Sequence, residues 1–186
     1  PDACCAGKTP EELCEELRQI FVQYLPEDIA VTEVRVASER FHSRLNVVKK
    51  TYVYRIWNAD YPNVFERKYM LHDNRPMDVE AMRQAAQYLL GKHDFAAFCG
   101  NAKMKKSTVR TIHEIDIRRI GEEIRFTYTG NGFLQNMIRI LTGTLVDVGC
   151  SVYPPERVVE ILASKVRAEA GPTMPAQGLT LWEVIY

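Results

Sequence analysis

The stretch KTYVYRIW, residues 50–57, decides the fold class of this chain. Its β-branched and aromatic residues alternate with the period of two that a β-strand has. One face carries Tyr52, Tyr54 and Ile56, and the other carries Thr51, Val53, Arg55 and Trp57. The stretch therefore predicts a long strand with two chemically different faces.

Further strands and helices are predicted on both sides of this strand. Strands are predicted at residues 29–36, 108–118, 123–128 and 179–185, with a turn at Gly121. Helices are predicted at residues 10–25, 79–90, 133–148 and 153–162. The first follows the capping box Thr9–Glu12, and the second lies between the N-cap Asp78 and Gly91. Because the elements do not alternate strictly as β-α-β, the predicted class is α+β, with a mixed, largely antiparallel sheet flanked by helices.

Composition indicates an ordinary soluble globular protein. The chain has 186 residues, of which 46% are hydrophobic and 26% charged, and no internal repeat is visible. We therefore expect a single domain over residues 1–186, in which residues 1 to about 28 form an N-terminal helix and its lead-in. No apolar run approaches the roughly 18–20 residues that cross a bilayer, which argues against a membrane protein.

The cysteines indicate free thiols in a reducing compartment. There are five, at positions 4, 5, 14, 99 and 150, without any C-x-x-C pair and without nearby histidine pairs. This pattern fits neither a disulfide framework nor a zinc site, so no metal is expected. The first residues have no signal-peptide pattern, and they lack an initiator Met. We expect a cytoplasmic protein, and we interpret this chain as a piece of something longer.

Charge is segregated although the net charge is zero. Residues 40–59 hold five basic residues and no acidic one, and residues 101–111 hold four basic residues and no acidic one. Two such segments can form a phosphate-binding face on a neutral protein. The alternative, two solvated edges, remains open at this point.

Four motifs, in this order along the chain, resemble those of the tRNA pseudouridine synthase A family. They are FHSR at 41–44 with KKTYVYRIWN at 49–58, LGKHDF at 90–95 with Phe98, GNGFLQNMIR at 130–139 with Gly143, and PAQGLTL at 175–181. The resemblance implies a pseudouridine synthase-like half and a homodimer. It also implies a cofactor-free isomerisation of uridine to pseudouridine in the tRNA anticodon stem-loop.

The family's catalytic aspartate lies in a G-R-T-D-A-G-V-H loop, and this chain contains no R-T-D. The family's opening strand is also missing, so the chain resembles the C-terminal part of such an enzyme and is expected to be inactive alone. Two alternatives remain open. One is a catalytically inert RNA-binding or dimerisation module, and the other is a folded remnant that self-associates through an exposed sheet edge.

The resemblance assigns supporting catalytic roles to Tyr52 and Arg139. Tyr52 would stack on a flipped uracil, and its hydroxyl would relay the C5 proton if a nearby cation lowered its pKa. Arg139 would pair with the missing aspartate, and an anion should take that place here. The plain alternatives are a half-buried strand tyrosine and a solvent-facing arginine.

Further residues are predicted to contact RNA or to pack in the core. Substrate-binding candidates besides Tyr52 are Phe41, His42 and Arg44. Candidates for RNA phosphate contacts are Lys49, Lys50, Lys103, Lys105, Lys106 and Arg110. Four apolar residues near the C-terminus are assigned to core packing: Leu181, Trp182, Val184 and Ile185.

Overall fold

The computed structural model describes residues 7–101 and 103–186. The chain divides into two units, Pro1–Asn46 and Val47–Tyr186. Cys14, Cys99 and Cys150 are free thiols, as the sequence predicts, whereas Cys4, Cys5 and the start of the lead-in lie outside the described residues.

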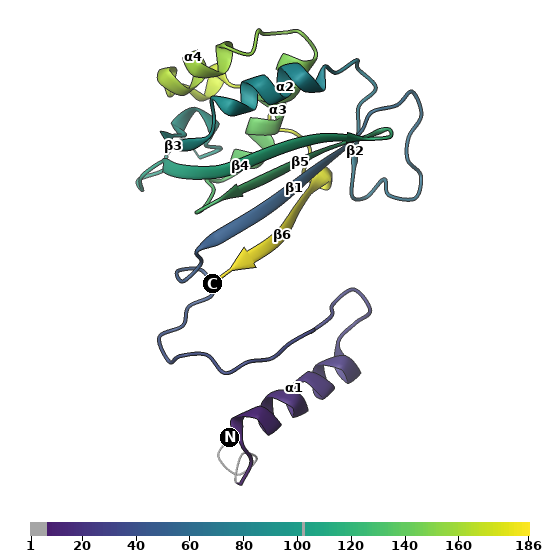
Figure 1. The fold of residues 1–186 in the computed structure, drawn as a ribbon, viewed down its shortest axis with the longest axis vertical. Helices are drawn as coiled ribbons and strands as arrows, with labels where there is room; N and C mark the ends of the chain where they lie inside the picture. The colour runs from purple at the N-terminus through teal and green to yellow at the C-terminus, as the bar shows by residue number, and fades with distance from the viewer. Residues whose placement is uncertain (1–6, 102) are drawn as a thin grey trace. The chain divides into compact units, whose positions relative to one another are not determined.

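The second unit contains the sheet and three α-helices (Figure 1). Its strands are β1 (Lys49–Trp57), β2 (Leu71–His72), β3 (Gly91–Asp94), β4 (Val109–Ile120), β5 (Glu123–Gly130) and β6 (Leu179–Ile185). Its α-helices are α2 (Val79–Gln87), α3 (Met137–Gly149) and α4 (Arg157–Ser164). Three short 3-10 turns are η1 (Ala96–Phe98), η2 (Arg167–Glu169) and η3 (Ala176–Gly178). The predicted mixed, largely antiparallel sheet is confirmed.

The sheet has the order β2-β1-β5-β4-β3, and β6 also pairs with β1. Only the short β1–β2 pairing is parallel. Lys50 of β1 lies opposite Gly130 of β5, which in turn lies opposite Ile112 of β4. The first residues of β1 and β4 therefore meet the last residues of β5 at one end of the sheet.

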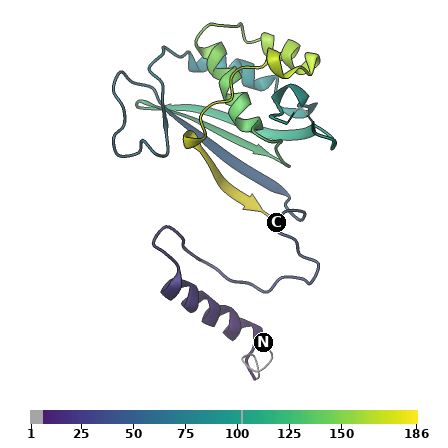
Figure 2. The ribbon, with the colours of Figure 1, turned by 180° about the vertical axis from the view of Figure 1, so that it is seen from behind.

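Helices α2, α3 and α4 lie on one face of this sheet, as Figures 1 and 2 show from opposite sides. The core forms between that face and the helices, because the even-numbered side chains of β1 point towards them. Tyr54 and Ile56 are fully buried there, and Phe126 and Tyr128 of β5 are stacked with ring centroids 6.4 Å apart. Burial of such apolar side chains is the main stabilising contribution to a core of this kind.

Several boundaries differ from the predicted ones for local reasons. Helix α3 begins at Met137 rather than at residue 133, because Asn136 adopts a left-handed backbone with φ 58°. Helix α2 ends at Gln87, and Gly91, with φ 91°, serves the turn into β3 instead of ending the helix. The hairpin turn at Gly121 is confirmed by its φ of 57°.

The assignment of the C-terminal strand to the core is wrong. In β6, Leu181 is 48% exposed, Trp182 is 70% exposed and Ile185 is 38% exposed, while Val184 is half-buried. The strand forms as predicted, but it lies at the sheet edge, where β1 is its one partner among the described strands. The register of this pairing shifts between Thr51 and Tyr52. An edge strand leaves apolar side chains at the surface when no further layer covers it.

The first unit contains α1 (Pro10–Tyr24), and the predicted capping box is confirmed. Thr9 accepts a hydrogen bond from the Glu12 amide, and the Glu12 carboxylate accepts one from the Thr9 amide. The strand predicted at residues 29–36 is wrong, because none of these residues forms a strand or pairs with a strand in the part of the chain that the structure describes. Within the described part of the chain, no helix is long and apolar enough to cross a membrane.

Candidate functional site

Tyr52 lies near the start of β1, on the face that the helices cover. Its ring meets Phe133 edge-on, with the ring centroids 5.4 Å apart. The close approach depends on Gly130, since a Cβ atom there would lie 3.0 Å from the Phe133 ring and 2.7 Å from the Thr111 carbonyl oxygen. The Gly130–Phe133 segment therefore positions one aromatic ring against the ring of Tyr52.

The Tyr52 hydroxyl makes no hydrogen bond with any residue that the structure describes. Burial raises the pKa of Tyr52 above its ordinary value near 10. This is opposite to the lowered pKa that a proton relay through a phenolate requires. Near neutral pH the side chain is a neutral phenol, available to stack and to donate a hydrogen bond.

Arg139 lies in the first turn of α3 and is half-buried. Its Nε donates a hydrogen bond to the Met174 carbonyl oxygen at 2.5 Å, and its Nη1 donates one to Asn136 Oδ1 at 3.0 Å. Both acceptors are neutral. Among residues 7–101 and 103–186, no carboxylate forms an ion pair with Arg139. The guanidinium is therefore held in place without having its charge neutralised.

Tyr54 connects this arginine to the sheet. Its hydroxyl donates to the Pro175 carbonyl oxygen at 2.6 Å, directly after the carbonyl that Arg139 holds. Burial raises the pKa of Tyr54, and the nearby charge of Arg139 acts in the opposite direction. Tyr54 and Arg139 thus contact successive residues of one backbone segment.

That segment, residues 170–175, crosses α3 at Gly143. A Cβ atom on Gly143 would lie 2.0 Å from the Pro172 carbonyl oxygen, so only glycine allows this approach. The Gly171 amide donates to Thr144 Oγ1, and the Met174 amide donates to the Arg139 carbonyl oxygen. The crossing segment therefore fixes the acceptor that orients Arg139.

The predicted phosphate contacts of the second unit gather at one end of the sheet. Lys49 and Lys50 begin β1, and Arg110 follows at the start of β4, with its Nε placed 3.8 Å from where a Cβ on Gly132 would lie. Three exposed lysines occupy the loop that leads into β4: Lys103, Lys105 and Lys106. The other three candidates, Phe41, His42 and Arg44, belong to the first unit, where the Arg44 amide donates to His42 Nδ1.

Comparison with known proteins gives consistent matches. The family model described as tRNA pseudouridine synthase matches residues 85–186, which include Arg139. The tRNA pseudouridine synthase A of Brevibacillus brevis is 43% identical over 172 residues, covering 92% of this chain and 70% of the relative. The chain belongs to the tRNA pseudouridine synthase family.

Two further relatives named tRNA pseudouridine synthase A support this membership. The protein of Oceanobacillus iheyensis is 42% identical over 170 residues, covering 91% of this chain and 67% of the relative. The protein of a Bacillus species is 45% identical over 157 residues, covering 84% of this chain and 64% of the relative. The chain thus spans about two thirds of the length of these family members.

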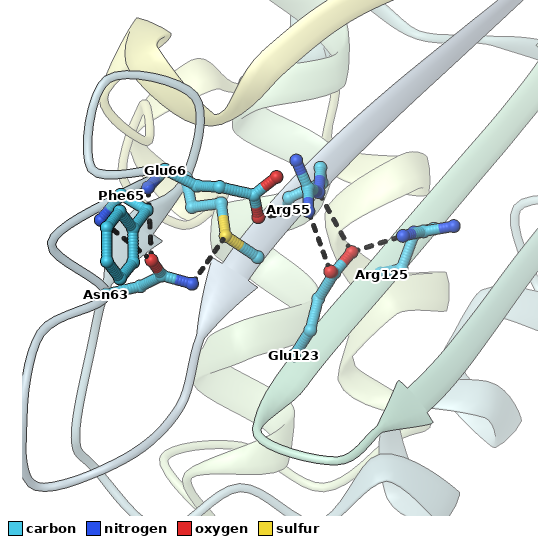
Figure 3. Close-up of polar contacts among 7 residues, drawn as sticks. Arg55, Asn63, Phe65, Glu66, Glu123 and Arg125 are labelled. Atoms are coloured by element: carbon cyan, nitrogen blue, oxygen red, sulfur yellow. Dashed lines mark hydrogen bonds and ion pairs between the residues drawn. The ribbon is translucent and has the colours of Figure 1, made fainter.

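A second polar cluster, which sequence reasoning did not identify, lies on the helix-free face of the synthase sheet (Figure 3). Arg55 binds Glu123 through Nε and Nη2, at 3.0 and 2.9 Å, and its Nη2 also contacts Glu66 at 2.7 Å. Arg125 Nε contacts Glu123 at 2.7 Å. Burial by itself would raise the pKa of Glu123, but the hydrogen bonds from Arg55 and Arg125 outweigh it and lower the pKa.

This cluster attaches the loop between β1 and β2 to the sheet. In that loop, Asn63 Oδ1 accepts hydrogen bonds from the Phe65 and Glu66 amides, and this turn directs Glu66 towards Arg55 (Figure 3). Beside the cluster is a depression of about 530 Å³. Its lining includes Thr51, Val53, Arg55, Glu114, Arg125, Thr127, Thr129, Trp182 and Glu183. Arg55, one of the five bases of residues 40–59, is thus committed to internal ion pairs and not to RNA.

No metal site is visible in the part of the chain that the structure describes. There, no three His, Cys, Asp or Glu side chains come together in a way that could hold a metal ion. The chemistry that the structure does present is an uncompensated arginine, a neutral phenol and a group of lysines at one end of the sheet.

Proposed function

We propose that this chain is the C-terminal part of an enzyme that isomerises uridine to pseudouridine in the anticodon stem-loop of tRNA. The observation that carries the proposal is Arg139, whose guanidinium is held by two neutral oxygens and, among the residues that the structure describes, by no carboxylate. A half-buried cation held in this way is suited to bind an anion. In the family, that anion is the carboxylate of the catalytic aspartate.

Three aspartates in or next to the sheet have other partners. Asp73 pairs with Arg75, Asp116 pairs with Arg118, and Asp94 accepts hydrogen bonds from Thr108 and Lys165. In the proposed reaction the bond from the ribose C1′ to N1 of uracil breaks and a bond from C1′ to C5 forms. The C5 proton passes to water and N1 takes up a proton, so the product is an isomer of uridine. The aspartate needed for this reaction would come from the part of the family members' sequence that this chain does not cover.

Tyr52 would contact the uracil that leaves the stack. A neutral phenol near Phe133 offers an aromatic surface, and stacking of one base on such a ring contributes about 1–3 kcal/mol. Its free hydroxyl would donate to a uracil carbonyl oxygen. Phe41, His42 and Arg44 remain proposed substrate contacts on the basis of the FHSR motif.

The proposal is tested by tritium release from tRNA labelled at uridine C5. We expect release by the full-length protein that contains this chain and none above background by the 186-residue chain alone. No release by the full-length protein would contradict the proposed reaction. Release by the chain alone would show that one of its own carboxylates performs the chemistry.

The lysines at the sheet end support binding to the phosphate backbone. Replacing Lys105 and Lys106 together with alanine should weaken tRNA binding by the full-length protein at low salt. The slope of log affinity against log salt should fall by about 0.7–0.9 for each lysine, because each phosphate contact releases counterions. Fluorescence titrations at four salt concentrations measure both effects.

Lys68 provides the matched control, since it is also exposed but lies in the loop beyond the opposite end of β1. Lys68→Ala should leave the slope unchanged. If the double lysine variant, Lys68→Ala and the wild type all gave the same slope, the loop that leads into β4 would not be part of the RNA-binding surface.

A homodimer and a cytoplasmic location are also part of the proposal. The exposed apolar side chains of β6, Leu181 and Trp182, support a contact with a further protein layer. The cytoplasmic location is supported by the bacterial relatives, whose name, tRNA pseudouridine synthase A, indicates that they act on tRNA.

A further inference from the structure

Asn136 has a backbone conformation that few residues adopt. It precedes α3 with φ 58° and ψ 7°, in the left-handed region, where asparagine is better tolerated than most other residues apart from glycine. Residues at this position often cap a helix with their side chain, but the Asn136 side chain makes no capping hydrogen bond. The conformation therefore serves something other than helix capping.

The Asn136 carboxamide lies between Gly100 and Arg139. Its Oδ1 accepts the hydrogen bond from Arg139 Nη1 at 3.0 Å. On its other side, a Cβ atom on Gly100 would lie 2.8 Å from Asn136 Nδ2 and 3.0 Å from Asn136 Cβ. The Gly100 amide donates to the Gln135 carbonyl oxygen at 2.8 Å, which fixes the two backbones relative to each other.

We propose that Asn136 is a positioning residue for Arg139, and that Gly100 supplies the space its carboxamide needs. This inference rests on the function proposed above for Arg139. The carboxamide and the Met174 carbonyl oxygen hold the guanidinium from two sides with uncharged acceptors. They fix its orientation while leaving its charge for a third group.

The arrangement also restricts how an anion can bind. A guanidinium has five N–H donors, of which Nε and one on Nη1 are engaged here. Because Nε is occupied, the edge formed by Nε and Nη2 is closed to a two-pronged contact. The two N–H groups of Nη2 have no acceptor among the described residues and remain for a carboxylate or phosphate.

Two variants of the full-length protein separate positioning from folding. Asn136→Gly keeps the left-handed backbone and removes the carboxamide. It should lower kcat for tritium release about tenfold, the factor expected for a hydrogen bond to a charged group, with KM for tRNA within about twofold. Asn136→Asp keeps the side-chain shape and the acceptor but adds a negative charge.

The order of the two variants is the decisive readout. If Asn136 acts through Arg139, the aspartate will neutralise the guanidinium and compete with the incoming anion. Asn136→Asp should then lower kcat more than Asn136→Gly does. If Asn136 were merely structural, Asn136→Asp would lower kcat less than Asn136→Gly, because its side chain has nearly the same shape as asparagine. A smaller loss in Asn136→Asp would therefore overturn the inference.

A double-mutant cycle completes the test. In an Arg139→Met background, Asn136→Gly should have no further effect on kcat beyond about twofold, because its target is gone. An undiminished tenfold loss in that background would refute a role through Arg139. If Arg139→Met itself left kcat unchanged, the role proposed for Arg139 would fail, so the two failures are distinguishable.

Gly100→Ala offers an independent check from outside the motif. Its new methyl group would displace the carboxamide, so kcat should fall in the same direction as in Asn136→Gly. Combining the two substitutions should cause little loss beyond that of Asn136→Gly alone, because only the 3.1 Å contact of the new Cβ with the Gln135 carbonyl oxygen remains. Full additivity would contradict the role assigned to Gly100.

Discussion

Replacing Arg139 with methionine in the full-length protein will lower the rate of tritium release from C5-labelled tRNA by about a hundredfold or more. The substitution keeps most of the side-chain volume but removes the charge that no described carboxylate neutralises. Loss of one preorganised donor at a site of developing charge typically costs about 10²–10³ in rate. Single-turnover kinetics at saturating enzyme measure the chemical step separately from binding.

Arg119→Met is the matched control. Arg119 Nη2 is likewise held by neutral oxygens, those of Asn58 and of the Met77 backbone, but Arg119 lies near the opposite end of the sheet. Its loss should leave the rate within about twofold. Arg139→Lys should fall between the wild type and Arg139→Met, because lysine keeps the charge and loses the planar fork. Wild-type rates in Arg139→Met would exclude Arg139 from the chemistry.

Replacing Gly143 with alanine will destabilise the fold by about 2 kcal/mol. The new Cβ would lie 2.0 Å from the Pro172 carbonyl oxygen, which is backbone and cannot rotate away. Overpacking typically costs about 1–3 kcal/mol, and this contact is at the severe end. The gain of about 1 kcal/mol for alanine over glycine in a helix offsets only part of it. Urea unfolding of the 186-residue chain measures the change.

Gly132→Ala is the control for this substitution. A Cβ at Gly132 has Arg110 Nε as its nearest neighbour, at an ordinary 3.8 Å, so the change in unfolding free energy should stay within about 0.5 kcal/mol. A Gly143→Ala chain as stable as the wild type would mean that residues 170–175 can leave α3 at little cost. The Met174 contact could then not orient Arg139.

The strands that alternate most clearly were predictable. β1 and the β4–β5 hairpin appear within two residues of their predicted positions, because period-two patterning and a glycine at the turn are local signals. The short strands β2 and β3 were not predicted. Two and four residues long, they carry no period of their own and exist only through pairing with β1 and β4.

Burial was less predictable than secondary structure. The alternating segment 29–36 pairs with no strand among the described residues, and the apolar residues of β6 lie at a sheet edge. Hydrophobicity shows that a side chain favours burial, but the packing of distant elements decides whether burial is available. The same limit applies to Arg55, whose basic character was visible while its acidic partners, Glu66 and Glu123, were not.

In the candidate site, too, the sequence identifies residues but not their contacts. The motifs identified Tyr52 and Arg139 as residues of interest, since each has a distinctive sequence context. The orientation of Arg139 depends on the Met174 carbonyl oxygen, which is 35 positions away. The pKa of Tyr52 is raised because the residue is partly buried. Neither contact has a sequence signal, because each forms only when separate elements pack.

The α+β class, the main strands, the family motifs and the lack of an R-T-D loop can therefore be predicted from the sequence, because all of them are properties of local or linear pattern. The folded structure was needed to show that Arg139 is held by neutral oxygens, that burial raises the pKa of Tyr52, and that Asn136 and the segment packed on Gly143 both hold Arg139 in place. Charge compensation, burial and close approach are properties of three-dimensional neighbours, and the chain acquires them only when α3, β1 and residues 170–175 meet.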